Sequence, residues 1–375
     1  MTKRLTVGID IRDLKIAKTG ARTYLEQILI EFRKNTYDCE IKYLDSPFKV
    51  YSGPNKFLKI IEHLRFFVWK QIVLPVKAYY NNCDILFCTD YFVPYLHLGF
   101  KPIPMFYDSF FYEYPEQCNP YWLKMFHTIG IGAARRCPYI ITLSEYSKSR
   151  LVHFTGIDSE KIIPIHLAPK INSQIEANPN FKPLFKLPTT KYLLHVGVLE
   201  KRKNLVRLIE ALKLVRDTGH TEYSLVLVGL PSSKNELDGS IEILETIKRL
   251  NLQDFVLLHG YASEEELSFF YKNAFLYVFP STNEGFGLPV LEAFHYQIPV
   301  IVSNNTCLKE VGAEATLSFN PFNTQEIADK IKAVIEQAEL RDELIQKGSK
   351  RLKLFSWEKT TKELIKIFKE AVNKN

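Results

Sequence analysis

The chain has 375 residues, of which 46% are hydrophobic and 24% are charged, as in an ordinary globular protein. The net charge of +7 lies in the first half, since residues 1–170 hold 23 Lys+Arg against 16 Asp+Glu and the later residues hold 26 of each. With a neutral second half and no reading motif, the chain does not fit a nucleic-acid-binding protein. A basic first half suits a phosphorylated substrate or an anionic membrane surface, although it could equally serve solubility.

The six cysteines form no CxxC pair, and no Cys/His cluster has zinc-site spacing. We therefore expect reduced thiols and no bound metal. The first residues contain no apolar signal-peptide region, and no run of 18 apolar residues could span a bilayer. These features predict a cytoplasmic protein that can still lie on the cytoplasmic face of a membrane as a peripheral protein.

At about 100–200 residues per domain, the length predicts two domains. The first half begins with an apolar run at 5–11 and an amphipathic helical pattern at 19–35. Further apolar runs, with helical patterns between them, lie at 83–89, 102–108, 139–144 and 161–167. This alternation predicts a parallel sheet covered on both faces. We expect residues 1–168 to form one Rossmann-like domain.

Residues 169–190 are rich in Pro and Asn and lack periodicity, which predicts an interdomain linker. A second alternation follows, with apolar runs at 191–199, 224–230, 255–260, 275–281 and 299–304. It predicts a second doubly wound domain. Ligands of such sheets bind at the carboxyl ends of the strands, so we expect a site in a cleft between the two domains.

The stretch PSTNEGFGLPVLEAF, residues 280–294, joins a predicted strand to a predicted helix. Because Pro289 suits the first turn of a helix, Glu284 falls in the loop and Glu292 about one turn inside the helix. Gly285 and Gly287 permit close approach to a ligand, and the free N–H groups favour a phosphate. The two carboxylates would repel a phosphate, so they are better suited to accept hydrogen bonds from hydroxyl groups. A ligand that has both hydroxyls and phosphates is a nucleotide sugar. A plain strand–turn–helix with a solvated Glu284 explains the spacing about as well.

A second candidate segment is HVGVLEKRKN, residues 195–204. It ends a predicted strand near Gly197 and then supplies Lys201, Arg202 and Lys203. Cations at the carboxyl end of a strand could hold a diphosphate and neutralise its charge as it leaves. The alternative is a solvated basic loop.

In their order along the chain, these segments resemble the retaining GT-B glycosyltransferases of family four, the group 1 glycosyl transferases. NEGFGLPVLEA matches the family's E-x7-E motif, and GVLEKRKNLVRLIEAL matches its phosphate-binding segment. The resemblance covers almost the whole chain and implies the GT-B fold. An acceptor-binding domain, residues 1–168, would face a donor-binding domain, residues 191–355, across a cleft. Residues 356–375 would form a C-terminal helix that crosses back to the N-terminal domain.

The resemblance also implies roles for single residues. Glu284 would contact hydroxyls of the donor sugar, and Glu292 would bind the ribose. Arg202 and Lys203 would hold the diphosphate and stabilise it as it leaves. Further contacts to the donor would come from Gly20, Gly197, Gly260, Tyr261, Gly285, Phe286, Gly287 and Leu288. Such enzymes transfer a sugar with retention and need no metal.

The chain departs from the family pattern on the acceptor side. Many relatives carry His-Asp where this chain has Tyr107 and Asp108. Tyr107 cannot be a cation at neutral pH, so Asp108 is the stronger candidate, as a base or beside the oxocarbenium. A turn aspartate at the end of a strand explains Asp108 comparably well. Tyr107 and Arg22 remain acceptor-side candidates. On the donor side, many relatives carry an arginine directly after the glycine of the phosphate-binding segment, where this chain has Val198, and Arg202 would serve in its place.

Residues 55–75 combine aromatic and basic side chains, namely Phe57, Phe66, Phe67 and Trp69 with Lys56, Lys59, Arg65 and Lys70. One interpretation is a surface helix that rests on anionic lipid, near a lipid-linked acceptor. We favour the other, a helix packed on the first sheet whose cations reach out to solvent, because apolar residues surround nearly the whole helix.

The sequence therefore predicts a retaining, metal-independent hexosyltransferase without a cofactor other than its nucleoside-diphosphate-sugar donor. Its acceptor would be a glycan or a lipid-linked sugar, in the assembly of a surface polysaccharide or glycoconjugate. The alternative is a non-catalytic partner subunit that binds nucleotide sugars. An NAD-dependent enzyme fits poorly, because no GxGxxG follows the first apolar run.

Overall fold

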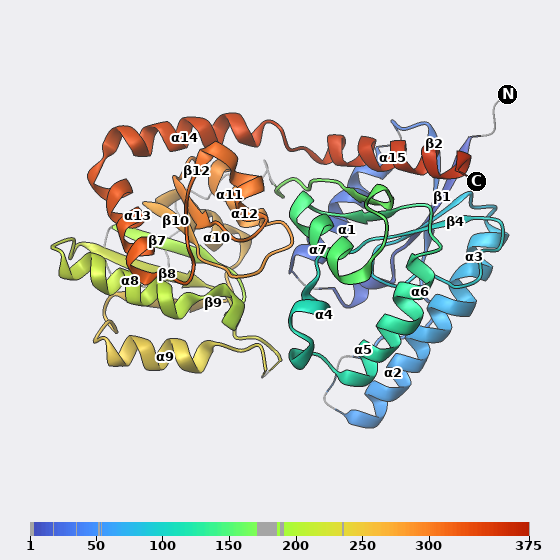
Figure 1. The fold of residues 1–375 in the computed structure, drawn as a ribbon, viewed down its shortest axis with the longest axis horizontal. Coiled ribbons are helices and arrows are strands. Elements are labelled where there is room, and N and C mark those ends of the chain that lie inside the picture. The colour runs from blue at the N-terminus through green and yellow to red at the C-terminus, as the bar shows by residue number, and fades with distance from the viewer. Residues whose placement is uncertain are drawn as a thin grey trace. The chain divides into compact units, whose positions relative to one another are not determined.

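The computed structural model describes residues 4–17, 19–34, 36–51, 53, 55–170, 186–187, 191–234 and 236–374. The chain divides into two compact units (Figure 1). The first unit comprises Met1–Ala168 with Ser356–Asn375, and the second comprises Pro169–Phe355. Most of the predicted linker at 169–190 lies outside the described residues.

The first unit is built on a four-stranded parallel sheet in the order β2–β1–β3–β4. Its strands are β1 (Leu5–Asp10), β2 (Cys39–Leu44), β3 (Ile85–Cys88) and β4 (Lys101–Pro104). A parallel pair, β5 (Ile140–Thr142) and β6 (Ile162–Pro164), joins it through a bridge between Met105 and Ile141. β3 is buried along its whole length, as expected for a parallel strand covered on both faces.

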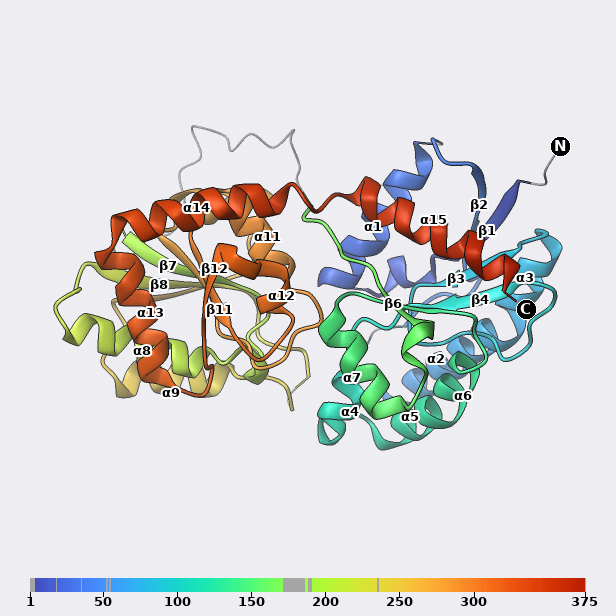
Figure 2. The same ribbon diagram turned by 45° about the horizontal axis from the view of Figure 1, so that its top comes forward.

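The first unit has helices from both ends of the chain. They are α1 (Thr19–Arg33), α2 (Lys56–Val68), α3 (Leu74–Tyr80), α4 (Phe110–Glu113), α5 (Pro120–Met125), α6 (Ile131–Ala134), α7 (Glu145–Thr155) and α15 (Trp357–Asn373). Figure 2 shows α15 lying beside α1. The Trp357 ring packs 6.1 Å from that of Tyr24, and Phe368 packs 5.3 Å from Phe87 of β3. The last helix is therefore part of the first unit's core.

The second unit has a six-stranded parallel sheet in the order β12–β11–β10–β7–β8–β9. Its strands are β7 (Lys191–Val196), β8 (Tyr223–Val228), β9 (Val256–Gly260), β10 (Leu276–Phe279), β11 (Val300–Ser303) and β12 (Thr316–Phe319). Its helices are α8 (Leu205–Asp217), α9 (Ser240–Arg249), α10 (Glu264–Asn273), α11 (Leu288–His295), α12 (Leu308–Gly312), α13 (Thr324–Glu336) and α14 (Ala338–Leu352). In Figure 2, α8, α9 and α13 cover one face of this sheet, and α11 and α14 cover the other. The predicted α/β class with two Rossmann-like domains is thus confirmed.

Candidate active site

Two loops of the second unit come together at the point where its strand order reverses. β8 and β9 lie on one side of β7, whereas β10, β11 and β12 lie on the other. The carboxyl ends of β7 and β10 therefore form the switch point at which doubly wound sheets bind their ligands. The loop at 197–204 leaves β7, and the loop at 280–287 leaves β10. They carry the predicted cationic run and Glu284.

Side chains and backbone fasten these two loops together. The Thr282 amide donates to the carbonyl of Arg202 at 2.8 Å. Asn204, which has a left-handed backbone with φ of 58°, donates its amide to the carbonyls of Pro280 at 3.1 Å and Pro321 at 2.7 Å. Asn is among the few residues that adopt this conformation readily. The cationic run is thereby held in place before α8 begins.

Glu284 is the acceptor for both predicted cations. Its Oε1 lies 2.6 Å from Lys203 Nζ and 3.1 Å from an Arg202 guanidinium nitrogen. Arg202 also donates to the Asn283 carbonyl at 3.0 Å and pairs with Glu200 at 2.7 Å. Glu284 and Lys203 are 9% and 7% exposed. The alternative of a solvated basic loop therefore fails for Lys203, and that of a solvated Glu284 fails as well.

The charges around Glu284 decide its protonation. Burial alone would raise its pKa, but the charges of Lys203 and Arg202 outweigh burial and lower the pKa to about 2. Burial lowers the pKa of Lys203, and the Glu284 carboxylate opposes that shift. Glu284 is thus an ionised acceptor, held by the two cations.

The glycine turn before α11 is required by both geometry and space. Gly287 has a φ of 95°, and a Cβ there would lie 2.4 Å from Leu308 Cδ2. α11 begins at Leu288 with Pro289 in its first turn, as predicted. Phe286 is 3% exposed and packs 6.2 Å from the Phe355 ring, so its side chain belongs to the core. The Phe286 side chain is therefore not a candidate for contact with a donor.

Glu292 lies on α11 and contacts one of three packed tyrosines that the sequence did not predict. The Tyr271 hydroxyl donates to Glu292 Oε2 at 2.8 Å. The Tyr271 ring is parallel to that of Tyr296, with centroids 5.2 Å apart, and packs 5.8 Å from Tyr277. Burial raises the pKa of Glu292. No local pattern reveals this contact, because Tyr271 comes from α10.

His195 is a second residue whose state the sequence did not reveal. It is fully buried in β7, and its Nδ1 lies 3.0 Å from the Val278 carbonyl. Its Nε2 has no hydrogen-bond partner in the described part of the chain and lies 3.4 Å from where a Cβ on Gly197 would be. Burial lowers the His195 pKa to about 4, so the ring is neutral at pH 7. His195 is therefore a core histidine with one of its two ring nitrogens hydrogen-bonded among the described residues.

The remaining donor-side candidates also lie at the carboxyl ends of strands in this sheet. Gly260 ends β9 with a φ of 80°, and Tyr261 follows it with 77% of its surface exposed. β9 is separated from β10 by β7 and β8. Gly197 follows β7 directly. The structure thus brings Glu284, Arg202, Lys203 and the Gly285–Gly287 backbone together, with Gly260 and Tyr261 farther along the edge.

The acceptor-side candidates all belong to the first unit, as does Gly20. Gly20 lies in the first turn of α1, and Arg22 forms an exposed ion pair with Glu26 at 2.8 Å. The Tyr107 hydroxyl donates to the Thr89 carbonyl at 2.8 Å. Asp108 accepts from the Tyr91 hydroxyl at 2.9 Å and from the Phe110 amide at 3.1 Å. These two contacts are those of a turn aspartate after a strand.

The first unit also contains a buried ionic cluster at the carboxyl ends of β1 and β3. Lys70 Nζ lies 2.5 Å from Asp10 Oδ2 and 2.5 Å from Asp90 Oδ1. Lys70 is 1% exposed, so it is a core cation, contrary to the expectation that the cations of this helix reach solvent. The Trp69 indole nitrogen donates to Asp10 at 3.2 Å.

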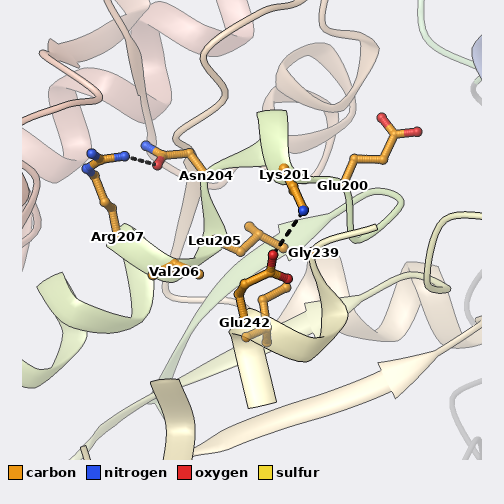
Figure 3. Close-up of a pocket in the computed structure, with 9 residues that line it drawn as sticks. Glu200, Lys201, Asn204, Leu205, Val206, Arg207, Gly239 and Glu242 are labelled. Carbon is orange, nitrogen blue, oxygen red and sulfur yellow. Dashed lines mark hydrogen bonds and ion pairs between the residues drawn. The ribbon is translucent and has the colours of Figure 1, made fainter. Parts of the chain in front are cut away.

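A surface pocket lies between the start of α8 and α9 (Figure 3). In it, Lys201 pairs with Glu242 at 3.0 Å, and Arg207 donates to Asn204 at 3.0 Å. Its other lining residues are Glu200, Leu205, Val206, Gly239 and Ile243. Lys203, Glu284 and Glu292 do not line this pocket, which adjoins the candidate site through Glu200, the partner of Arg202.

The described residues contain no group of three or more His, Cys, Asp or Glu side chains arranged to hold a metal ion. They also contain no helix that is long and apolar enough to cross a membrane. All six cysteines are free thiols.

Residues 177–351 match the family described as glycosyl transferases group 1. The chain is similar to O-antigen chain mannosyltransferase B of Escherichia coli, with 29% identity over 234 residues, which are 61% of this chain and 60% of that protein. It is also similar to an uncharacterised glycosyltransferase of Methanocaldococcus jannaschii, with 30% identity over 275 residues, covering 69% and 74% of the two chains. The chain therefore belongs to the group 1 glycosyl transferases.

The chain spans only part of its other bacterial relatives. Matches to further mannosyltransferases of E. coli and Salmonella typhimurium span 29% to 52% of those proteins. Among solved structures, Anabaena HepE in complex with UDP-glucose has a TM-score of 0.70, covering 98% of this chain and 100% of that one at 16% identity. At this identity the likeness concerns the fold, which is GT-B.

Proposed function

We propose that this glycosyltransferase moves a hexose, with retention, from a nucleoside-diphosphate sugar to a glycan or lipid-linked acceptor in polysaccharide or glycoconjugate assembly. The observation that carries this proposal is the buried contact of Glu284 with Lys203 and Arg202 at the switch point of the second unit. The O-antigen mannosyltransferase relative supports the choice of a hexose and of polysaccharide assembly. The free thiols fit a reducing compartment, and we propose a cytoplasmic enzyme.

The donor would bind along the carboxyl edge of the second sheet. Glu284 would accept hydroxyl groups of the sugar, and Glu292 would accept those of the ribose. Lys203 and Arg202 would bind the diphosphate through their positive charges, assisted by the backbone from Gly285 to Gly287. The UDP-glucose complex of a protein with the same fold supports a nucleotide sugar as the donor.

The site would promote the reaction by stabilising the negative charge of the departing diphosphate. The bond between the anomeric carbon and the diphosphate oxygen breaks, and the acceptor oxygen bonds to the same face of the sugar. The departing diphosphate gains negative charge, which Lys203 and Arg202 would neutralise in a buried, low-dielectric setting. With these two cations at the diphosphate no metal would be needed, and the acceptor proton would pass to the diphosphate oxygen. In the first unit, Asp108, Tyr107 and Arg22 would contact the acceptor.

The experiment that tests this function measures release of nucleoside diphosphate from a panel of UDP- and GDP-hexoses, with and without oligosaccharide or lipid-linked acceptors. We expect one donor to be consumed in the presence of acceptor. Proton NMR of the product should show the anomeric configuration of the donor. Inverted configuration would contradict retention, and tight binding without turnover of any donor would favour the non-catalytic partner subunit.

A further inference from the structure

One face of the helical segment at residues 56–80 in the first unit is apolar and turned outward. α2 and α3 follow one another on the outside of this unit, joined by a π-helical turn at Trp69–Val73 (Figure 1). Between 40% and 78% of each apolar side chain is exposed at Phe57, Ile60, Leu64, Ile72, Val76, Tyr79 and Tyr80. Monomeric proteins in water seldom leave so long an apolar surface without a partner.

The π-helical turn keeps these side chains on one face. Each residue of an α-helix turns the chain by about 100°, so steps of four residues drift by about 40° each around the helix. The wider π-helical turn holds one extra residue and so turns the later residues back by about one residue's rotation. Ile72 and Val76 therefore follow Ile60 and Leu64 in one stripe. Trp69, Leu74 and Ala78, which are fully buried, occupy the opposite face.

The charges that accompany the stripe are basic. Glu62 is the only acidic residue among residues 56–80. Its carboxylate is held by Arg12 at 2.6 Å and by the Tyr51 amide at 3.0 Å, with 14% of the side chain exposed. Lys59 and Arg65, by contrast, are exposed. The outward face of the segment thus combines apolar side chains with two cations, Lys59 and Arg65, that pair with no acidic side chain among the described residues.

A loop after β3 extends this surface. Gln71 ties the loop to the helix, since its amide nitrogen donates to the Val93 carbonyl at 3.1 Å and its oxygen accepts from the Tyr95 amide at 2.9 Å. The loop exposes Tyr95, Leu96 and Leu98. The guanidinium of Arg136 lies 4.7 Å from the centre of the Tyr95 ring and adds another cation.

We propose that this docking surface, formed by the exposed side chains of residues 56–80 and 95–98, binds a membrane that contains anionic lipid. Apolar side chains of an interfacial helix enter the boundary between headgroups and acyl chains, and cations beside them meet the lipid phosphates. A second copy of the chain fits less well, because a two-fold pairing would bring Lys59 and Arg65 of both copies into one interface. Docking needs no donor, so it is independent of the proposed function.

The test is co-sedimentation of the full chain with vesicles of phosphatidylcholine alone or with phosphatidylglycerol added. The double variant Ile60→Glu/Leu64→Glu places two charges on the stripe. Its matched control is Ile241→Glu/Leu244→Glu on α9, where the two side chains are 65% and 55% exposed. Wild type and control should bind the anionic vesicles equally, and the stripe variant should bind more weakly by about tenfold per side chain.

Charge is tested separately with Lys59→Gln/Arg65→Gln, which should remove the preference for phosphatidylglycerol vesicles. This variant keeps the apolar stripe, so it serves even if the glutamate variant fails to fold, as judged by circular dichroism. Equal binding of a folded Ile60→Glu/Leu64→Glu variant and wild type would overturn the proposal, as would failure of wild type to bind the anionic vesicles. A wild-type dimer that these glutamates convert to a monomer, without vesicle binding, would assign the surface to a second copy.

Discussion

Lys203 Nζ lies 2.6 Å from Glu284 Oε1, although the two residues are 81 positions apart in the chain. β7 and β10 are paired neighbours in the sheet, and each residue stands in the loop that leaves one of these strands. The contact is buried and joins a carboxylate that is ionised at neutral pH to a lysine cation. We propose that a ligand with hydroxyls and phosphates is recognised at this contact.

Replacing Lys203 should weaken binding of the nucleoside diphosphate. Lys203→Gln removes a charge-assisted contact, so we expect the affinity to fall by about ten- to a hundredfold, corresponding to about 1.5–3 kcal/mol. Calorimetric titration of the purified protein with UDP and GDP measures this. Lys201→Gln is the control, because Lys201 is half exposed and pairs with Glu242 instead. Unchanged affinity in the folded Lys203 variant would show that Lys203 does not bind the diphosphate.

Glu284 should make stability depend on pH. Its folded pKa of about 2 lies below its ordinary value of 4.5, so the ionised carboxylate stabilises the fold above pH 4.5, and this contribution is lost as the pH falls toward 2. The shift corresponds to roughly 3 kcal/mol. The difference in unfolding temperature between Glu284→Gln and wild type should be largest near neutral pH and should become smaller in acid. Glu242→Gln, at an exposed ion pair, should show a small effect, and a gap that stays constant with pH would contradict the coupling.

Tyr271 should control how Glu292 recognises a ribose. Tyr271→Phe keeps the ring stack and removes the hydroxyl that positions the carboxylate, so discrimination between ribo- and 2′-deoxyribonucleoside diphosphates should fall by about three- to tenfold. Titration with both nucleotides measures this ratio. Tyr296→Phe keeps the parallel stacking and serves as the control. If Tyr271→Phe discriminates as wild type does, Tyr271 only packs.

A side chain at Gly287 should destabilise the second unit. Gly287→Ala meets both a left-handed φ and a contact at 2.4 Å with Leu308, so we expect a loss of about 1–3 kcal/mol in the free energy of unfolding. Chemical denaturation measures it. Gly20→Ala should cost nothing in stability, because a Cβ there meets nothing within 4 Å. Equal stability of the two variants would show that the turn relaxes at little cost.

Much of the fold could be predicted from the sequence because buried parallel strands leave continuous apolar runs. β7, β8 and β10 begin or end within a few residues of their predicted positions. β2 was missed, because the strands were predicted from continuous apolar runs, whereas at the edge of this sheet Glu40 and Lys42 alternate with apolar residues, as is typical of a half-buried strand.

The approach of Glu284 and Lys203 could be predicted, because both residues follow the carboxyl ends of strands. Contacts that depend on packing between distant elements could not be predicted. Tyr271 reaches Glu292 from another helix, and Lys70 reaches Asp10 from 60 positions away. Lys70 also contradicts one part of the favoured interpretation of residues 55–75, namely that the cations of this helix reach solvent. The helix packs on the sheet as expected, but it turns that cation inward and leaves apolar side chains in solvent.

The most direct test compares nucleoside diphosphate release by wild type, Glu284→Gln and Lys201→Gln, using the preferred donor with its acceptor at a pH where all three are folded. Wild type and Lys201→Gln should release the nucleotide at similar rates, and Glu284→Gln should be slower by about a hundredfold or more. If a folded Glu284→Gln variant turns over the donor as fast as wild type, the loops after β7 and β10 do not form the active site.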